Sequence, residues 1–278
     1  MIRAWFHNAA ENGSSFFRRS AILKKDLSSR VHLIDEVRGF AIICMVFYHA
    51  MFDLVVIFGV DFPIFTSSLM QDVLQPLFAG LFIFISGTAG HYSRSNLKRG
   101  AVCFGFGLIL TVVTALFMPD ELILFGILHF LGIAMMLFPL LKKLAAHIPP
   151  LAGVGIGLLM FWLFSDVPNG AIGLPPLFSF SLPSFFYSTA FLFPIGLPGA
   201  GFFSSDYFPI FPWIFVFFTG VSFGRVVKAN RCPKWFYKMH CRFLAFVGRH
   251  TIVVYLLHQP VCYGAMLLLF TFLPNLQK

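Results

Sequence analysis

The sequence is poor in charged residues. Only 11% of its 278 residues are Asp, Glu, Lys or Arg, whereas 58% are hydrophobic, 39 are phenylalanine and the mean hydropathy is +0.85. A soluble domain carries about 25% charged residues, because its surface must face water. This composition therefore excludes a soluble globular protein and indicates an integral membrane protein.

Long apolar runs take the place of that missing polar surface. A helix needs about 20 apolar residues to cross about 30 Å of hydrocarbon. Seven stretches reach or approach this length, at residues 39–59, 73–92, 100–117, 122–141, 150–165, 207–227 and 246–270. The sequence therefore predicts an all-α membrane protein, a polytopic bundle of about seven transmembrane helices.

Lys and Arg are missing from every second connection between these stretches. The charged residues of the first, third and fifth connections are all acidic. The N-terminal tail and the second, fourth and sixth connections are rich in Lys and Arg. Basic residues favour the cytoplasmic side, so the alternation predicts a cytoplasmic N-terminus and seven crossings. The net charge of +9 follows from this topology and suits an anionic lipid bilayer, so no nucleic acid partner is expected.

The five cysteines lie in apolar stretches or in one basic connection, none of them on the expected outer side. They are Cys44, Cys103, Cys232, Cys241 and Cys262. This distribution implies no disulfide framework. Two of them flank His240, but the spacing is wrong for zinc and a fourth ligand is missing, so no metal is expected.

We expect two parts, a basic cytoplasmic tail over residues 1–30 and a transmembrane domain over residues 31–278. The tail lacks the short apolar core and cleavage site of a removable signal peptide. Residues 166–206 form a long outer loop, rich in Pro, Gly and Phe, which is too apolar to be disordered and should fold over the outer mouth. Within it, residues 185–196 are too short to cross and are a candidate re-entrant segment.

Arg38 and His49 are ionisable residues in the first apolar stretch. Such side chains cost about 2.5 to 3.5 kcal/mol near the bilayer centre, so they persist mainly where they function. They are eleven residues apart, close to three helical turns, which puts both on one face about 16 Å apart along the axis. Asp53 follows one turn later and would orient the imidazole. We predict His49 and Asp53 as catalytic residues, with an interfacial carboxylate as the alternative for Asp53.

Four further residues are candidates for the acceptor site. His129 and His258 lie at mid-membrane depth, although a lone buried histidine is more often structural than catalytic. Tyr48 adjoins His49, and Asp206 opens the sixth stretch, where a helix cap is the alternative. Because no helix carries a ligand-spaced pair of histidines, we expect no metal centre.

Several blocks, in order, resemble a known family. Arg38, Gly39 and His49 match the first span of membrane acyltransferases that O-acetylate sugars, and FIFISG at residues 82–87 is similar to that superfamily. The fuller pattern most closely resembles bacterial relatives of the heparan-alpha-glucosaminide N-acetyltransferase catalytic domain, within the transmembrane acyltransferase superfamily. The blocks that carry it are LIDEVRGFAIICMVFYHAMFD, GILHFLGI, SSDYFPIFPW and VGRHTIVVYLLHQP.

The resemblance implies an acetyltransferase that takes acetyl-CoA from the cytoplasm and acetylates an amine or hydroxyl of a sugar or glycan on the far side. His49 would be the general base or acyl carrier, because the loop over residues 59–72, where the lysosomal enzyme has its histidine, contains none. Arg38 would bind a donor phosphate. Arg94, Lys98 and Arg99 would add phosphate contacts, with topology signals as the alternative.

Two other functions stay open. Buried His and Asp residues also build proton relays, so a proton-coupled permease of a small solute is the main alternative, although the chain shows no two-half repeat. A non-catalytic membrane subunit is the third, packed through small residues such as Gly153 and Gly157. We expect the cell membrane, plasma or inner, as the location, and a homo-oligomer is compatible with the sequence.

Overall fold

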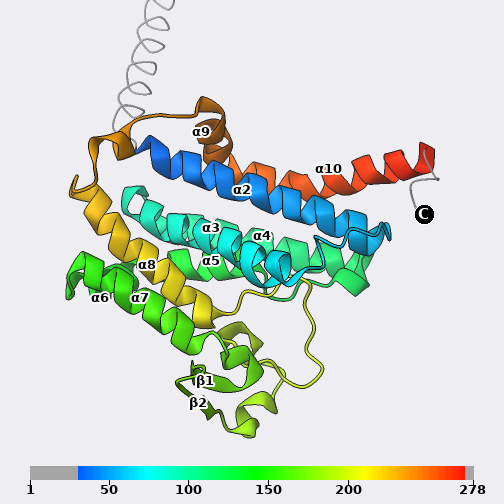
Figure 1. Cartoon of the computed structure of the whole chain (residues 1–278), viewed down its shortest axis with the longest axis horizontal. Helices are drawn as coiled ribbons and strands as arrows, with labels where there is room; N and C mark the ends of the chain where they lie inside the picture. Colours follow the sequence, from blue (N-terminus) through cyan, green and yellow to red (C-terminus); the bar gives the residue numbers. More distant parts are fainter. Residues whose placement is uncertain (1–30, 273–278) are drawn as a thin grey trace, which may run out of the picture.

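The computed structural model describes residues 31–272, and the expected tail over residues 1–30 lies outside them (Figure 1). The described chain forms a helical bundle with one small hairpin. Its α-helices are α2 (His32–Phe52), α3 (Gln75–Ala89), α4 (Asn96–Phe117), α5 (Ile127–Met136), α6 (Phe138–Ala146), α7 (Pro150–Phe164), α8 (Ile210–Lys228), α9 (Arg242–Arg249) and α10 (Thr251–Phe272). Short π-helical segments continue α2 at η1 (Asp53–Ile57) and precede α3 at η2 (Leu69–Leu74).

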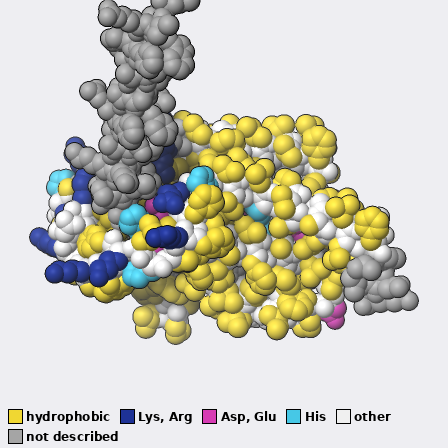
Figure 2. Space-filling view, turned by 90° about the horizontal axis from the view of Figure 1, so that it is seen from above, with side chains coloured by type: hydrophobic (Ala, Val, Ile, Leu, Met, Phe, Trp, Pro, Cys, Tyr) yellow, Lys and Arg dark blue, Asp and Glu magenta, His cyan; other side chains and the backbone are white. Residues whose placement is uncertain are grey.

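Among residues 31–272, six helices are long and apolar enough to cross a membrane, and α5 with α6 makes a seventh if the bent pair counts as one span. The expected all-α polytopic membrane fold is thereby confirmed. Figure 2 shows why the bundle suits lipid: hydrophobic side chains cover its long sides, whereas Lys and Arg gather at one end. We call the latter the basic end.

The fourth and seventh spans differ from the uniform helices that hydropathy predicts. α5 and α6 meet at an angle of 58°, because Pro139 in the first turn of α6 has no N–H to continue the preceding helix. The last span begins later than expected. α9 is a separate helix that ends at Arg249. The backbone of His250 is not helical, and α10 starts at Thr251.

Glycine residues let neighbouring helices approach closely. α4 packs on α5. Both α3 and α7 pack on α8, and α2 lies beside α3, α9 and α10 (Figure 1). Gly153 and Gly157 of α7 face Ser222 and Thr219 of α8, where a β-carbon on either glycine would collide with the facing side chain. The small-residue pair noted in the sequence is therefore a helix contact, as is common in membrane proteins.

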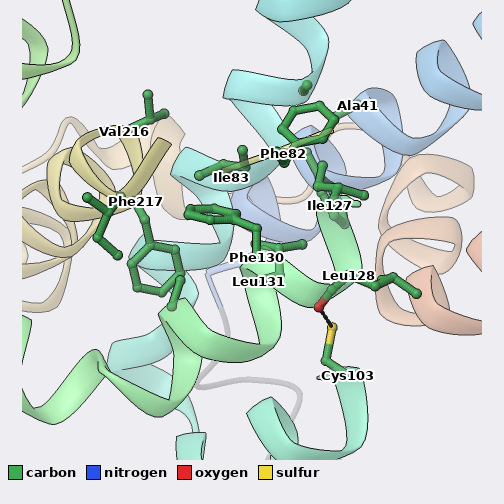
Figure 3. Packing of buried hydrophobic residues seen from close by; sticks show 14 of the residues in the cluster. Ala41, Phe82, Ile83, Cys103, Ile127, Leu128, Phe130, Leu131, Val216 and Phe217 are labelled. Carbon is green, nitrogen blue, oxygen red and sulfur yellow. Dashed lines mark hydrogen bonds between the residues drawn. The ribbon is translucent and has the colours of Figure 1, made fainter. Parts of the chain in front are cut away.

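The core lies where α5 is surrounded by its neighbours. Phe130 and Phe217 are fully buried, with Ile83 and Ile127 beside them, and the Cys103 thiol contacts the Leu128 carbonyl oxygen at 3.5 Å (Figure 3). α5 is buried on nearly every side. The helices around α5 therefore hold it in place, and a space between them can use α5 as one of its walls.

The long loop between α7 and α8 folds into turns and one hairpin. β1 (Ala171–Leu174) pairs antiparallel with β2 (Phe178–Ser181) in the register Ala171 with Ser181. The candidate re-entrant stretch contributes only the 3-10 turns η6 (Ser184–Tyr187) and η7 (Phe193–Ile195). Such short turns, separated by irregular backbone, do not form a helix that enters the bilayer. The remaining 3-10 turns are η3 (Gly90–Tyr92), η4 (Pro119–Glu121), η5 (Val167–Asn169) and η8 (Lys234–Tyr237).

Candidate active site

A cavity of about 310 Å³ lies toward the end of the bundle opposite the basic end. Its walls come from α2, α3, α4, α5 and α10, and the segment before α8 closes it. Most of the lining side chains are apolar. The polar ones are Tyr48, His49, Gln75, Thr114, Glu121, Ser205, Asp206, Tyr255, His258, Gln259 and Tyr263. We refer to this space as the cavity.

Two histidines face each other in the cavity. The rings of His49 on α2 and His258 on α10 have centroids 5.0 Å apart. Nδ1 of His258 is 2.5 Å from the Tyr255 carbonyl oxygen. A carbonyl oxygen can only accept, so Nδ1 carries the proton and Nε2 is the basic nitrogen. That Nε2 has no hydrogen-bond partner among the described residues, which leaves it free to accept a proton from a bound molecule.

Tyr48 lies beside this pair. Its ring packs edge-on against His49 with centroids 5.8 Å apart, and its hydroxyl donates to Gln71 Oε1 at 2.9 Å. Gln71 in turn donates to the Phe65 carbonyl oxygen at 2.8 Å. The contacts connect α2 to the segment before α3, so the cavity wall is held together by side chains at its outer edge.

Asp53 has a different partner from the one that its spacing led us to expect. Its Oδ1 accepts a hydrogen bond from Gln259 Nε2 at 2.6 Å, and its side chain is fully buried behind the cavity wall. The physical reason is the neighbour on α10, where Gln259 presents an amide N–H to the carboxylate. The backbone from His49 to Asp53 stays α-helical, since the Asp53 N–H bonds to the His49 carbonyl oxygen. Asp53 is thereby joined to α10 at the residue that follows His258, and its second carboxylate oxygen has no hydrogen-bond partner among the described residues.

His129 caps a helix instead of lining the cavity. Its Nδ1 accepts from the Gly126 N–H at 3.2 Å, its Nε2 lies 3.3 Å from the Thr111 hydroxyl, and its ring stacks on Phe125. Both ring nitrogens are thus satisfied by α4 and the start of α5. These contacts agree with a structural role for His129, the alternative to a role in the acceptor site.

Asp206 joins the cavity to the start of α5. Its Oδ2 accepts from the Ile127 N–H at 2.9 Å, which caps α5 rather than the helix that follows Asp206 in the chain. Ser204 strengthens the link by accepting from the Leu124 N–H at 3.1 Å. Burial raises the pKa of the Asp206 carboxyl to about 6, although the Ile127 N–H opposes this shift. Asp206 also lines the cavity, so one residue both caps α5 and belongs to the candidate site.

A second, polar pocket of about 620 Å³ lies at the basic end. All four cations predicted from the sequence line it, together with one that was missed. They are Arg38, Arg94, Lys98, Arg99 and Arg249. Arg38 Nη1 is 3.1 Å from Asp35 Oδ1 and donates to the Gly248 carbonyl oxygen at 3.3 Å. We call this space the basic pocket.

Close contact between α2 and α9 brings Arg249 into the basic pocket. A β-carbon on Gly39 would collide with the Leu244 carbonyl, and one on Gly248 with the Asp35 carbonyl. Buried Glu36 adds to the contact, because its Oε1 accepts from the backbone N–H groups of His240 at 2.7 Å and Cys241 at 3.1 Å. The block VGRHTIVVYLLHQP contains Arg249, so its presence in a matched block was the available signal.

α2 connects the two spaces. The helix is unbroken from His32 to Phe52, so Arg38 and His49 lie on one side of it, as their spacing predicts. Ile42 lies on the same stripe between them, is fully buried, and lines neither space. Packed side chains therefore separate the basic pocket from the cavity.

A comparison with known protein families identifies the family of the chain. The family model of the heparan-alpha-glucosaminide N-acetyltransferase catalytic domain matches residues 30–260. The chain belongs to this family, which is a family of membrane acetyltransferases. Neither the curated proteins nor the solved structures gave a match to the chain. Among residues 31–272, no group of three or more His, Cys, Asp or Glu side chains is placed to hold a metal ion.

Proposed function

We propose that this member of the heparan-alpha-glucosaminide N-acetyltransferase catalytic family transfers an acetyl group from cytoplasmic acetyl-CoA to a sugar-like acceptor on the other side of the membrane. One observation carries the proposal. A single helix has Arg38 in a pocket of cations near one end and His49, facing His258, in a cavity near the other. The acceptor group would be an amine or a hydroxyl.

The basic pocket suits the donor's phosphates. Five cationic side chains line it; four are arginines, and the fifth, Lys98, lies next to Arg99 along the chain. Guanidinium groups bind phosphate oxygens in a bidentate way, so Arg38, Arg99 and Arg249 would provide the directional contacts and Lys98 a point charge. The distance of about 16 Å along α2 from Arg38 to His49 suits a long, thin pantetheine arm. Passage of that arm requires Ile42 and its neighbours to move aside.

The histidine pair would manage the acceptor's proton. The acceptor nitrogen or oxygen attacks the thioester carbonyl carbon, the new bond to the acetyl group forms, and the bond to sulfur breaks. His49 takes the proton that the acceptor loses and returns it to the departing thiolate. His258 supports this step, since its Nε2 is free to accept a hydrogen bond in the cavity. An acetyl-histidine intermediate on His49 is the two-step version of the same transfer.

The test uses purified full-length protein, radiolabelled acetyl-CoA and a panel of amino sugars and hydroxylated glycans. We expect His49→Ala to lower kcat by about 10² to 10⁴ and Arg38→Ala mainly to raise KM for acetyl-CoA. His147→Ala is the matched control, because His147 is exposed at the end of α6 and should be silent.

Two results would overturn the proposal. One is full transfer activity in His49→Ala. The other is solute uptake into liposomes that needs no acetyl-CoA, which would instead support the proton-coupled permease.

A further inference from the structure

We propose that the acceptor is itself a membrane molecule, an amine or hydroxyl head group on a hydrocarbon chain, which enters the cavity sideways between α4 and α10. This inference rests on the proposed acetyl transfer and adds the chemical class of the acceptor. It starts from the shape of the cavity wall. α4 packs against α5 and α10 packs against α2, whereas α4 and α10 barely touch each other in the described chain.

On each side of the gap between α4 and α10, one residue lines the cavity and is also exposed on the surface of the bundle. Val113 on α4 lines the cavity and is also 43% exposed. Pro260 on α10 lines the cavity and is exposed as well. A side chain that is accessible from both sides marks an opening in the wall. We call this opening the side gap.

The surroundings of the side gap decide what can enter it. α4 and α10 are both among the helices long and apolar enough to cross a membrane. The medium outside the gap is therefore lipid, in which a free sugar does not dissolve. A molecule that arrives through the side gap must carry a hydrocarbon chain, whereas its head group can be polar if the cavity satisfies it.

The cavity offers an apolar part and a polar part in the positions that such a molecule needs. Leu110 and Val113 from α4 and Leu256 from α10 are apolar lining residues beside the gap. Toward the loop segments, Glu121 and Asp206 add carboxylates that suit an amine or hydroxyl. Pro260 has no N–H, so it leaves the Leu256 carbonyl without its helical donor and able to accept from a head group.

A labelling experiment tests entry independently of catalysis. The full chain is placed in nanodiscs that contain phosphatidylethanolamine with a diazirine in its acyl chain, and cross-linked peptides are identified after illumination. Because α4 and α10 also face lipid on their outer sides, the readout is label at the buried cavity residues Tyr255 and His258, where we expect it. Val113→Trp should remove it by filling the gap, and Val112→Trp should not, because Val112 is exposed on the same helix without lining the cavity.

A transfer experiment tests the acceptor class. Methyl and octyl glucosaminide present the same amine with different chains. We expect the octyl compound to have the higher kcat/KM, on the order of tenfold for every two methylenes buried in the gap. The preference should collapse in Val113→Trp and persist in Val112→Trp.

The outcomes separate the two proposals. Label without transfer to either glucosaminide or to the wider panel would overturn acetyl transfer and leave sideways entry standing. Transfer that ignores chain length, with equal labelling of both tryptophan variants, would overturn the membrane acceptor and leave acetyl transfer. Cross-linking of Val113→Cys between two copies, with no lipid label, would overturn it too, since the gap would then be a subunit interface.

Discussion

The basic pocket and the cavity share one helix but differ in the groups that line them. The basic pocket collects five cations at the end of the bundle, with Arg38 held by Asp35 and by a backbone carbonyl. The cavity is mostly apolar, and its two histidines face each other inside the span region. The difference fits the proposed division of roles: the donor's phosphates would bind where water also reaches, and proton transfer would take place in an interior where electrostatic interactions are less screened.

The sharpest test of this division is His258→Ala. We expect kcat to fall by about 10², with donor affinity unchanged, because His258 lines the cavity and not the basic pocket. Leu257→Ala is the matched control, since Leu257 is the adjacent residue of α10 and faces outward. Single-turnover kinetics and equilibrium binding of acetyl-CoA separate the two effects. An equal loss of donor binding would mean that the two regions are not distinct.

Gly39→Leu should damage the basic pocket through the backbone. The new side chain would meet the Leu244 carbonyl and push α9 away from α2, at a cost of about 1 to 3 kcal/mol or more for overpacking. Thermal unfolding in detergent and acetyl-CoA affinity measure the damage. Gly105→Leu is the control, because a β-carbon on Gly105 meets nothing within 4 Å. Wild-type stability in Gly39→Leu would contradict the close contact.

Arg249→Ala should weaken donor binding without affecting the chemical step. Loss of one charged hydrogen bond costs about 1.5 to 3 kcal/mol, so we expect the Kd for acetyl-CoA to rise by about ten- to a hundredfold at constant kcat. Arg242→Ala, at the exposed start of α9, removes the same charge outside the pocket and should have little effect. Equal effects of the two variants would point to general charge attraction rather than to a specific contact.

The smallest expected effect concerns the pH dependence of stability at Asp206. Burial raises the pKa of its carboxyl from 3.8 to about 6 in the folded protein. Between these values the folded state binds more protons than the unfolded state, so stability falls as pH rises through this window and then levels off. Asp206→Asn keeps an acceptor for the Ile127 N–H and should flatten that decline. Thermal midpoints between pH 4 and pH 6 measure it, with the exposed Asp72→Asn as control.

Much of the fold could be predicted because hydropathy acts locally. Apolar length alone indicated the spans, and Pro139 was a visible signal for the bend between α5 and α6. The break at His250 had no such signal, because no proline or glycine stands at the junction itself. The hairpin of β1 and β2 was also missed, since residues 171–181 look like the irregular loop around them.

The site was predictable along one helix and not between helices. Arg38 and His49 share a side of α2 because three turns separate them. The partners of Asp53 and Asp206 come from other parts of the chain: Gln259 is 206 positions from Asp53, and Ile127 is 79 positions from Asp206. Sequence spacing carries no information on such contacts. They depend on how α10 and the segment before α8 pack against the bundle.

Ile42 has a consequence for the membrane as a whole. A water-filled passage between the basic pocket and the cavity would let ions leak across the membrane. The fully buried Ile42, on the stripe between Arg38 and His49, puts an apolar side chain between the two spaces. In the proposed transfer, the pantetheine arm of the donor would fill the opening as it moves, so the bilayer would stay closed to ions.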